Sequence, residues 1–461
     1  MKPKILIAVL VLAGILILSR AFIFVKNKIV ERRSQQAAFE PGGGGSGAPL
    51  MFGFVHGLSN ISDKKETARL ISNIHPTAWR VSNLYPTVYD FLDKNGIIIA
   101  NDTKIIFNLN DAFVSRHGYG GKNNEYYVDV SAPCNKSRYP NCVSTYQELE
   151  TAWTKFMRDF METATRNNVQ VDYYDVFSEP DVFWNGLSRN QFFQIFKISH
   201  DIIRQYKPDA KISAPSISEY NKGVIKDFMK FAADNDLRLD AVAWHEFGKP
   251  EAVVGHVSEI KSYLNHLYEN KPQIKDKEIH INEFQGPEGH TVPGDAVAWL
   301  YYLEKAGVDE ASKACWDNEQ NRKSWSDCEN GLNGLLLEDN KTPQPLYWVY
   351  EAYGNLGPQR INSETSHPNL VSIASKNDSQ KEVRVLVGNY GKNQINSEIK
   401  IPNYPYKAAA LRIIIKRIPN NPLTALENLE VVLDGTQPGT GNDLIISLRV
   451  FPGEAYTMTI I

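Results

Sequence analysis

The chain has 461 residues, too many for one ordinary domain but a fitting length for a large barrel with a smaller module. Its formal net charge is −3, so no basic surface points to a nucleic-acid partner. Aromatic residues make up 11% of the chain, with 8 Trp and 22 Tyr, which suits either carbohydrate-binding surfaces or an aromatic-rich core.

The N-terminus carries a long apolar run. Residues 5–25 are apolar apart from Ser19 and Arg20, and about 20 such residues are enough to span a bilayer. Lysines and arginines lie on both sides of the run, so charge alone does not settle its orientation. A cleaved signal peptide is the alternative, but no small-x-small cleavage site follows. We therefore expect a transmembrane anchor over residues 1–28.

The cysteines form two local pairs, Cys134 with Cys142 and Cys315 with Cys328. Four cysteines permit three pairings, of which these local ones are the natural choice. Zinc binding is the alternative, but the spacings are not the usual short pairs and no run of histidines lies nearby. Disulfides require an oxidising compartment, which predicts that the large C-terminal part lies outside the cytoplasm, in the periplasm if the host is bacterial.

A glycine-rich flexible linker over residues 29–49 leads into alternating strand-like and helix-like segments between residues 50 and 358. The expected strands are 51–56, 78–82, 104–110, 173–179, 211–216, 239–245, 278–283 and 311–316. The expected helices are 63–74, 145–167, 190–206, 223–234, 251–270, 294–306 and 344–355. Eight strands separated by helices predict an α/β fold, a (β/α)8 TIM barrel with parallel strands.

The pattern changes beyond the barrel, where strand-like runs follow one another with turn residues and little helix between them. These runs are 383–387, 411–416, 429–433 and 444–450. They predict a C-terminal antiparallel β-sandwich module over residues 359–461.

Two glutamates stand at the ends of predicted barrel strands. Glu179 closes the fourth strand and is followed by Pro180, while Glu283 closes the seventh strand shortly before Gly286. An acid at the mouth of a buried strand is costly unless it has a chemical role. Strands four and seven face each other across the barrel mouth, so the two carboxylates can converge on one substrate. A pair of carboxylates about 5–5.5 Å apart is what a retaining glycosidase needs.

With these motifs in place, the chain resembles the clan A glycoside hydrolases, and within that clan family 39. That family contains β-xylosidases, α-iduronidases and bacterial endoglycosidases that act on biofilm exopolysaccharides. The resemblance covers roughly residues 50–358, and the later β module also suits the family. It rests on Ser-Glu-Pro-Asp at strand four, Asn-Glu-Phe at strand seven and a tryptophan after strand eight, in that order.

The resemblance implies that Glu179 is the general acid/base and Glu283 the nucleophile. Ser178 stands where the family usually has an asparagine that contacts the sugar 2-hydroxyl. His245 matches a histidine that follows strand six, and Trp316 matches an aromatic residue that floors the sugar site. A tyrosine that touches the nucleophile often stands two residues after that histidine, but this chain has Phe247 there.

Several further residues are candidates for the site with an open alternative for each. Arg80 either orients a carboxylate such as Glu283 or pairs with a structural acid, and Asn282 either supports the nucleophile or caps a turn. His56 either lines the pocket or is structural. Two aromatic residues are candidate sugar platforms or packing residues, Trp184 and Tyr119.

The sequence therefore predicts a membrane-anchored, extracytoplasmic retaining glycosidase that cuts a polysaccharide or oligosaccharide, such as an exopolysaccharide or cell-surface glycan. No metal or organic cofactor is expected, and a monomer is favoured. The alternative is a non-catalytic carbohydrate-binding protein on a glycosidase fold, with Ser178 and Phe247 as marks of drift. A scaffold whose β module binds a protein partner is a third possibility that no residue supports.

Overall fold

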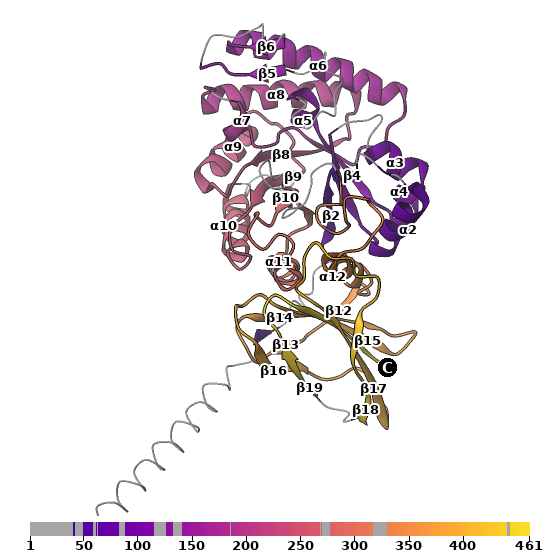
Figure 1. The fold of residues 1–461 in the computed structure, drawn as a ribbon. Helices are drawn as coiled ribbons and strands as arrows, with labels where there is room; N and C mark the ends of the chain where they lie inside the picture. The colour runs from indigo at the N-terminus through magenta and orange to yellow at the C-terminus, as the bar shows by residue number, and fades with distance from the viewer. Residues whose placement is uncertain are drawn as a thin grey trace, which may run out of the picture.

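The computed structural model describes residues 40–41, 49–58, 61, 63–82, 88–114, 126–131, 141–184, 186–267, 269, 277–316, 330–439 and 443–461. Figure 1 shows a strand-and-helix barrel with a β module packed against one side of it. Within the described part of the chain, no helix combines the length and apolar character needed to cross a membrane. The anchor predicted over residues 1–28 lies outside the described residues.

Eight parallel strands close into a barrel, in the circular order β2-β3-β4-β7-β8-β9-β10-β11. They are β2 (Met51–Val55), β3 (Ala78–Val81), β4 (Lys104–Asn108), β7 (Tyr173–Asp175), β8 (Lys211–Ile217), β9 (Ala241–Glu246), β10 (Glu278–Phe284) and β11 (Glu310–Lys313). All eight lie on the predicted strands, so the predicted barrel is confirmed. Three predicted C-terminal ends are wrong by two or more residues: Leu109 and Asn110 begin a helix, the fourth strand ends at Asp175 rather than Glu179, and the eighth ends at Lys313 rather than Trp316.

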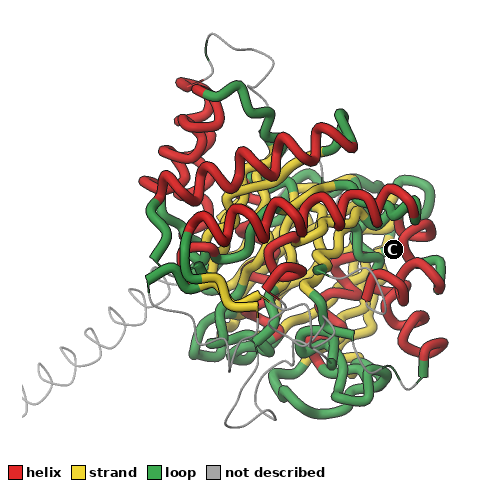
Figure 2. Tube along the Cα trace, turned by 90° about the horizontal axis from the view of Figure 1, so that it is seen from above, coloured by secondary structure: helices red, strands yellow, loops and turns green. Residues whose placement is uncertain are grey.

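Helices surround the strands, as the view from above shows (Figure 2). They are α2 (Lys64–Ile74), α3 (Val88–Lys94), α4 (Ile97–Asn101), α5 (Leu109–Val114), α6 (Tyr146–Arg166), α7 (Pro180–Phe183), α8 (Arg189–Tyr206), α9 (Lys222–Asp234), α10 (Ala252–Leu267), α11 (Pro293–Ala306) and α12 (Pro345–Gly354). The seven predicted helices are present. The short helices α3, α4, α5 and α7 were not predicted, because segments of four to seven residues are too short to show a helical period.

The long helices form where apolar spacing and capping residues agree. In α6, Leu149, Trp153 and Phe160 are buried on one face, as their spacing predicts. Helix α8 begins with a capping box, in which the side chains of Ser188 and Gln191 bond each other's backbone N–H groups. A small parallel pair, β5 (Tyr126–Val128) with β6 (Asn141–Val143), precedes α6 and is not part of the barrel.

The C-terminal module contains two antiparallel sheets, in agreement with the predicted all-β pattern. The six-stranded sheet has the order β12-β14-β15-β20-β17-β18, and the four-stranded sheet has the order β1-β13-β16-β19. Their strands are β1 (Glu40–Pro41), β12 (Gln359–Ile361), β13 (Glu364–Thr365), β14 (Leu370–Asn377), β15 (Glu382–Asn389), β16 (Ile395–Ile401), β17 (Ala410–Ile418), β18 (Glu430–Pro438), β19 (Leu444–Val450) and β20 (Ala455–Ile460). Strand β1 comes from the predicted linker and pairs with β13.

The module's core lies between its two sheets. Val385 and Ile413 from the six-stranded sheet share one buried apolar cluster with Ile399 and Ile446 from the four-stranded sheet. The opposite face of the six-stranded sheet packs against the barrel helices α11 and α12. Strand β15 and helix α11 approach closely at Gly388, where an added Cβ atom would lie 2.5 Å from the Cβ atom of Val297.

Candidate active site

Glu179 lies four residues beyond the end of β7, at the N-cap of helix α7. Its backbone is left-handed, with φ 48° and ψ 49°, a conformation that costs a non-glycine residue about 1–3 kcal/mol. The backbone N–H of Glu179 donates to the carbonyl oxygen of Ser216 at 2.8 Å. Ser216 and His56 are also left-handed and lie at the ends of β8 and β2. Three residues with strained, left-handed backbone therefore lie at the barrel mouth, where this conformation directs their side chains inward.

Glu283 belongs to β10 itself. The pairing of β10 with β9 shifts register between Ile281 and Glu283, so that Glu283 lies opposite His245. The side chain of Glu283 is 16% exposed and that of Glu179 is 18% exposed. Both carboxylates therefore sit in a nearly enclosed place that solvent still reaches.

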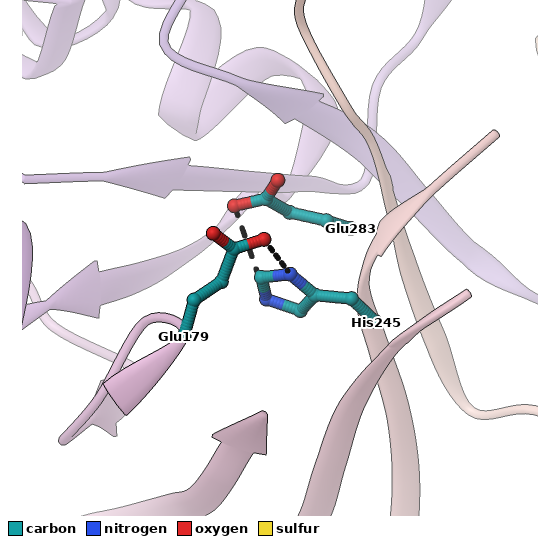
Figure 3. Close-up of side chains that lie close together, drawn as sticks. All are labelled: Glu179, His245 and Glu283. Carbon is teal, nitrogen blue, oxygen red and sulfur yellow. Dashed lines mark hydrogen bonds and ion pairs between the residues drawn. The ribbon is translucent and has the colours of Figure 1, made fainter. Parts of the chain in front are cut away.

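The structure brings the two carboxylates together around His245 (Figure 3). One carboxylate oxygen from each glutamate and one ring nitrogen of His245 all lie within 4.8 Å of one another. The Nδ1 atom of His245 is 3.1 Å from Oε1 of Glu179, and its Nε2 atom is 3.9 Å from Oε1 of Glu283. The three donor groups are also close enough together to hold a metal ion.

His245 is fully buried between two acids, which decides its electrostatics. Burial alone lowers the pKa of an imidazole, because it disfavours the charged form. The charges of Glu283 and Glu179, with the hydrogen bond to Glu179, outweigh that burial and raise the pKa of His245 above its ordinary value. A protonated His245 donates to Glu179 and carries positive charge between the two carboxylates.

Arg80, at the third position of β3, combines both roles predicted for it. Its Nη1 atom lies 2.6 Å from Oε1 of Glu283, and its Nε and Nη2 atoms each lie 2.8 Å from Oδ2 of Asp175. A third bond runs from Nη2 to the carbonyl oxygen of Phe177 at 3.3 Å. Although burial opposes its charge, Asp175 and Glu283 raise the pKa of Arg80. The guanidinium therefore fixes the position of the Glu283 carboxylate.

Asp175 is the residue that sequence reasoning missed. It is fully buried at the end of β7, where it accepts bonds from Asn282 Nδ2 at 2.8 Å and Ser216 Oγ at 2.5 Å. These contacts fix Asp175, and Asp175 in turn holds the Nε and Nη2 atoms of Arg80, while Nη1 contacts Glu283. An acid inside an otherwise apolar strand was the available signal. Asn282 thus supports, through Asp175, the arginine that contacts Glu283 rather than capping a turn.

The remaining predicted residues lie at different depths. Ser178 is buried, and its carbonyl oxygen accepts a bond from Asn110 Nδ2 at 2.9 Å. The Nε2 atom of His56 is buried beside the mouth, 3.5 Å from Oδ2 of Asp111. Asp111 in turn contributes to the raised pKa of Arg80, which places the pair near the site.

Aromatic side chains line one side of the site. The indole nitrogen of Trp316 donates to the carbonyl oxygen of Gln285 at 2.9 Å, which holds the ring beyond the end of β11. Phe247 lies edge-on between Trp316 and His245, with ring-centroid distances of 4.9 Å and 5.5 Å. Trp316 therefore reaches the site through Phe247.

The platform interpretation of Trp184 is wrong. This side chain is only 3% exposed and belongs to the hydrophobic core, with its ring against Trp153 and Phe177. Its position next to α7 had suggested a loop at the mouth, but the ring turns inward. Tyr119, the other candidate platform, lies outside the described residues.

The described cysteines, Cys142 and Cys315, are both disulfide-bonded. Their predicted partners, Cys134 and Cys328, lie outside the described residues. The pairing therefore stays a prediction.

No protein-family model matches the chain. A 3-O-α-D-galactosyl-α-L-arabinofuranosidase of Bifidobacterium longum subsp. longum is 23% identical over 224 residues, which are 47% of this chain and 18% of that enzyme. The chain thus spans less than a fifth of the length of that curated relative.

Solved structures match over nearly the whole chain. The GH39 enzyme from Xanthomonas axonopodis pv. citri has a TM-score of 0.61 at 13% identity, covering 90% of this chain and 95% of that one. A monomeric β-xylosidase from Caulobacter crescentus CB15 also has a TM-score of 0.61, at 10% identity, covering 90% and 97%. The fold is that of a clan A glycoside hydrolase of the family 39 type. The predicted resemblance is therefore confirmed at the level of the fold.

Proposed function

We propose that the chain is a retaining glycoside hydrolase in which Glu283 is the nucleophile and Glu179 the general acid/base. The observation that carries the proposal is the approach of the two carboxylates. One oxygen of Glu179, one oxygen of Glu283 and one ring nitrogen of His245 all lie within 4.8 Å of one another. Retaining enzymes hold their carboxyl groups about 5–5.5 Å apart, whereas inverting enzymes leave about 6.5–9.5 Å for a water molecule. One sugar ring can then touch both acids.

The surroundings of each acid fit its proposed role. Glu283 is held through Oε1 by Arg80, which leaves its second oxygen available to attack the anomeric carbon. Glu179 shares a hydrogen bond with His245, a group whose pKa is raised and which can hold a proton beside it. The two acids thus stand in different environments, as an acid and a nucleophile need to.

The proposed reaction proceeds in two displacements. A carboxylate oxygen of Glu283 bonds to the anomeric carbon while the bond from that carbon to the leaving oxygen breaks, and Glu179 gives its proton to that oxygen. Water then attacks the same carbon, Glu179 takes one of its protons, and the ester to Glu283 breaks. No step in this scheme uses a metal or an organic cofactor.

We extend the proposal to a polysaccharide or oligosaccharide substrate, such as an exopolysaccharide or cell-surface glycan. The relatives named above act on arabinofuranosides and xylosides according to their names. The apolar run over residues 5–25 and the glycine-rich segment after it support an extracytoplasmic protein held to the membrane. A tether of this kind suits a polymer handled near the membrane surface.

A panel of 2-deoxy-2-fluoro glycosides tests the mechanism directly. The fluorine slows breakdown of the glycosyl-enzyme, so mass spectrometry of the digested protein should find the sugar on the peptide that contains Glu283. Glu283→Gln should abolish labelling and lower hydrolysis by roughly 10⁴-fold. Glu288→Gln, an exposed glutamate five residues further on, is the matched control and should change neither. Labelling of another residue would overturn the assignment.

Release of reducing ends tests the substrate class. The soluble domain should produce new reducing ends from at least one capsule or biofilm polymer, and Glu179→Gln should prevent this. If polymers bind but no bond breaks with any of them, the chain is instead a carbohydrate-binding protein on a glycosidase fold.

A further inference from the structure

A pocket of about 510 Å³ lies where the β module meets the barrel, between helix α12 and the outer face of the six-stranded sheet. Figure 1 shows α12 beside the strands of that sheet. We call it the junction pocket, and the lining residues that matter here are Trp348, Glu351, Arg384, Lys416, Thr457 and Thr459. It shares no lining residue with the catalytic pair. Its volume is within the range of small-molecule sites and ample for a sugar ring.

The alternation of the strands explains why polar groups line this pocket. In β17, Ile413 and Ile415 point into the module's core, so Lys416 points to the opposite face, toward α12. In β20, Met458 points into the same core, which turns Thr457 and Thr459 outward. A sheet face made only to pack against a helix is apolar, as it is where β15 meets α11. The outer face here combines the apolar Ile414 with Lys416, Thr457 and Thr459, and these polar side chains suit contact with a hydrated ligand.

Lys416 is the most informative residue of the pocket. It is exposed, and it makes no hydrogen bond or ion pair with any residue that the structure describes. Glu351 faces the same pocket and is half-buried on α12. Burial raises the pKa of Glu351, while the charges of Lys416 and Arg384 act in the opposite direction. An ammonium and a carboxylate thus face one cavity without pairing with each other.

The other cation of the pocket is already held in place. The Nε atom of Arg384 bonds the carboxylate of Glu382, and its Nη1 atom donates to the carbonyl oxygen of Asn355 at 2.8 Å. Its side chain remains 38% exposed. Glu382 neutralises the charge of Arg384. The charged groups left to bind a ligand in the pocket are therefore Lys416 and Glu351. A ligand must offer an anion to the first and hydroxyl donors to the second.

An aromatic wall completes the pocket. The indole nitrogen of Trp348 donates to the carbonyl oxygen of Leu426 at 2.8 Å, which fixes the ring while part of its surface lines the cavity. The apolar C–H face of a sugar packs against such a ring, and threonine hydroxyls bond its hydroxyl groups. A sugar that also carries a carboxylate would satisfy Lys416.

We propose that the junction pocket is a second, non-catalytic binding site for a uronic-acid residue of a glycan. In this arrangement the carboxylate contacts Lys416, the ring lies on Trp348, and ring hydroxyls bond Glu351 and the two threonines. The site would hold a polymer on the side of the barrel, away from the two catalytic glutamates.

Calorimetric titration of the full chain tests the proposal. The acidic probes are trigalacturonate and a hyaluronan tetrasaccharide, and galactotriose is the matched neutral probe. All titrations are made with the Glu283→Gln variant, so that no probe is hydrolysed. At least one acidic probe should bind, and galactotriose should bind at least tenfold more weakly. Lys416→Ala should weaken acidic binding about tenfold, and Lys416→Glu should remove it. Lys392→Ala, an exposed lysine of the same module outside the pocket, is the control.

Three outcomes would overturn the proposal. They are the absence of heat with both acidic probes, equal affinity for galactotriose, and acidic binding that Lys416→Glu leaves intact. The last of these would place the ligand elsewhere, for example at the catalytic glutamates. Binding is scored here without hydrolysis, so this test and the fluorosugar test of the catalytic roles can fail independently.

Discussion

The interior of the barrel contains buried charged side chains, whereas the core of the β module is apolar. The barrel encloses Arg80, Asp175, His280 and Glu310, each with 0% exposed surface. The buried cluster between the two module sheets consists of aliphatic residues with Tyr404, Tyr456 and Met458. Buried charges contribute little net stability, because desolvation offsets their mutual attraction. The aliphatic core, by contrast, stabilises the fold in proportion to the apolar surface area that it removes from water.

The buried charges of the barrel position side chains, whereas the apolar core of the module mainly provides stability. The barrel's charged interior forms one line from Glu283 through Arg80 to Asp175, and it ends on Asn282 and Ser216. Each contact in this line restricts the orientation of the next, so the carboxylate at the mouth is fixed from below. In the described strands of the module, Arg417 pairs with the nearly buried Glu454, but the cluster between the two sheets is apolar. Breaking each interior should therefore have a different signature.

Arg80→Met should give the largest effect. It removes the partner of Asp175 and Glu283 together, and an uncompensated buried charge costs about 3–5 kcal/mol. Urea denaturation measures this loss, and hydrolysis by the molecules that remain folded should also fall sharply. Arg412→Met removes an ion pair on the module surface, whose partners are 53% and 45% exposed, and should cost less than about 1 kcal/mol. Similar costs for the two variants would mean that the barrel pair is not buried in solution.

Ile399→Ala should destabilise without touching the chemistry. Ile399 is fully buried in the module core, and truncating such a side chain costs roughly 3 kcal/mol. Activity per folded molecule should stay the same, because no part of the charged line changes. The control is Ile445→Ala, an outward-facing neighbour that is 47% exposed and should cost less than about 0.5 kcal/mol. A loss of activity per folded molecule with Ile399→Ala would show that the module positions the site around Glu179 and Glu283.

Much of this organisation could be predicted from local patterns. The eight barrel strands are short apolar runs between amphipathic helices, and such periodicity depends on burial that the whole fold provides. Glu179 and Glu283 could be singled out because acids are rare at the ends of buried strands. The end of the fourth strand could not be predicted. Val176 and Phe177 continue the apolar pattern, but the backbone of residues 176–179 turns toward β8, where the Glu179 N–H donates to the Ser216 carbonyl oxygen.

The contacts within the site depend on residues far apart in the chain. Asp175 looks like one acid among several, and only closure of the barrel brings it to Arg80, 95 residues away. Trp184 shows the opposite error, because its position after the Glu-Pro turn suggested exposure while its ring packs into the core. Side-chain direction at a strained turn is set by the neighbouring strands, and a single sequence does not contain that information.

The smallest effect concerns a second buried acid of the barrel. Glu310 on β11 faces His280, Ser312, Arg80 and Asp175, and burial raises its pKa from the ordinary 4.5 to about 7. The folded protein therefore holds a proton that the unfolded chain releases at lower pH. The stability that this proton provides is complete below about pH 4.5 and is lost as the pH rises through 7.

Glu310→Gln isolates that contribution, because the amide keeps the shape of the protonated acid and does not titrate. Between pH 5 and pH 8 the unmodified chain should lose on the order of 2 kcal/mol of unfolding free energy relative to the variant, somewhat less than the full shift implies, because the interior relaxes around the charge. Urea melts at both pH values measure the difference. A parallel change in both proteins would mean that Glu310 is ionised throughout, compensated by His280, whose Nδ1 atom lies 3.9 Å from it. The barrel interior would then hold its charges as pairs down to its centre, and positioning by ion pairs would extend well below Glu179 and Glu283.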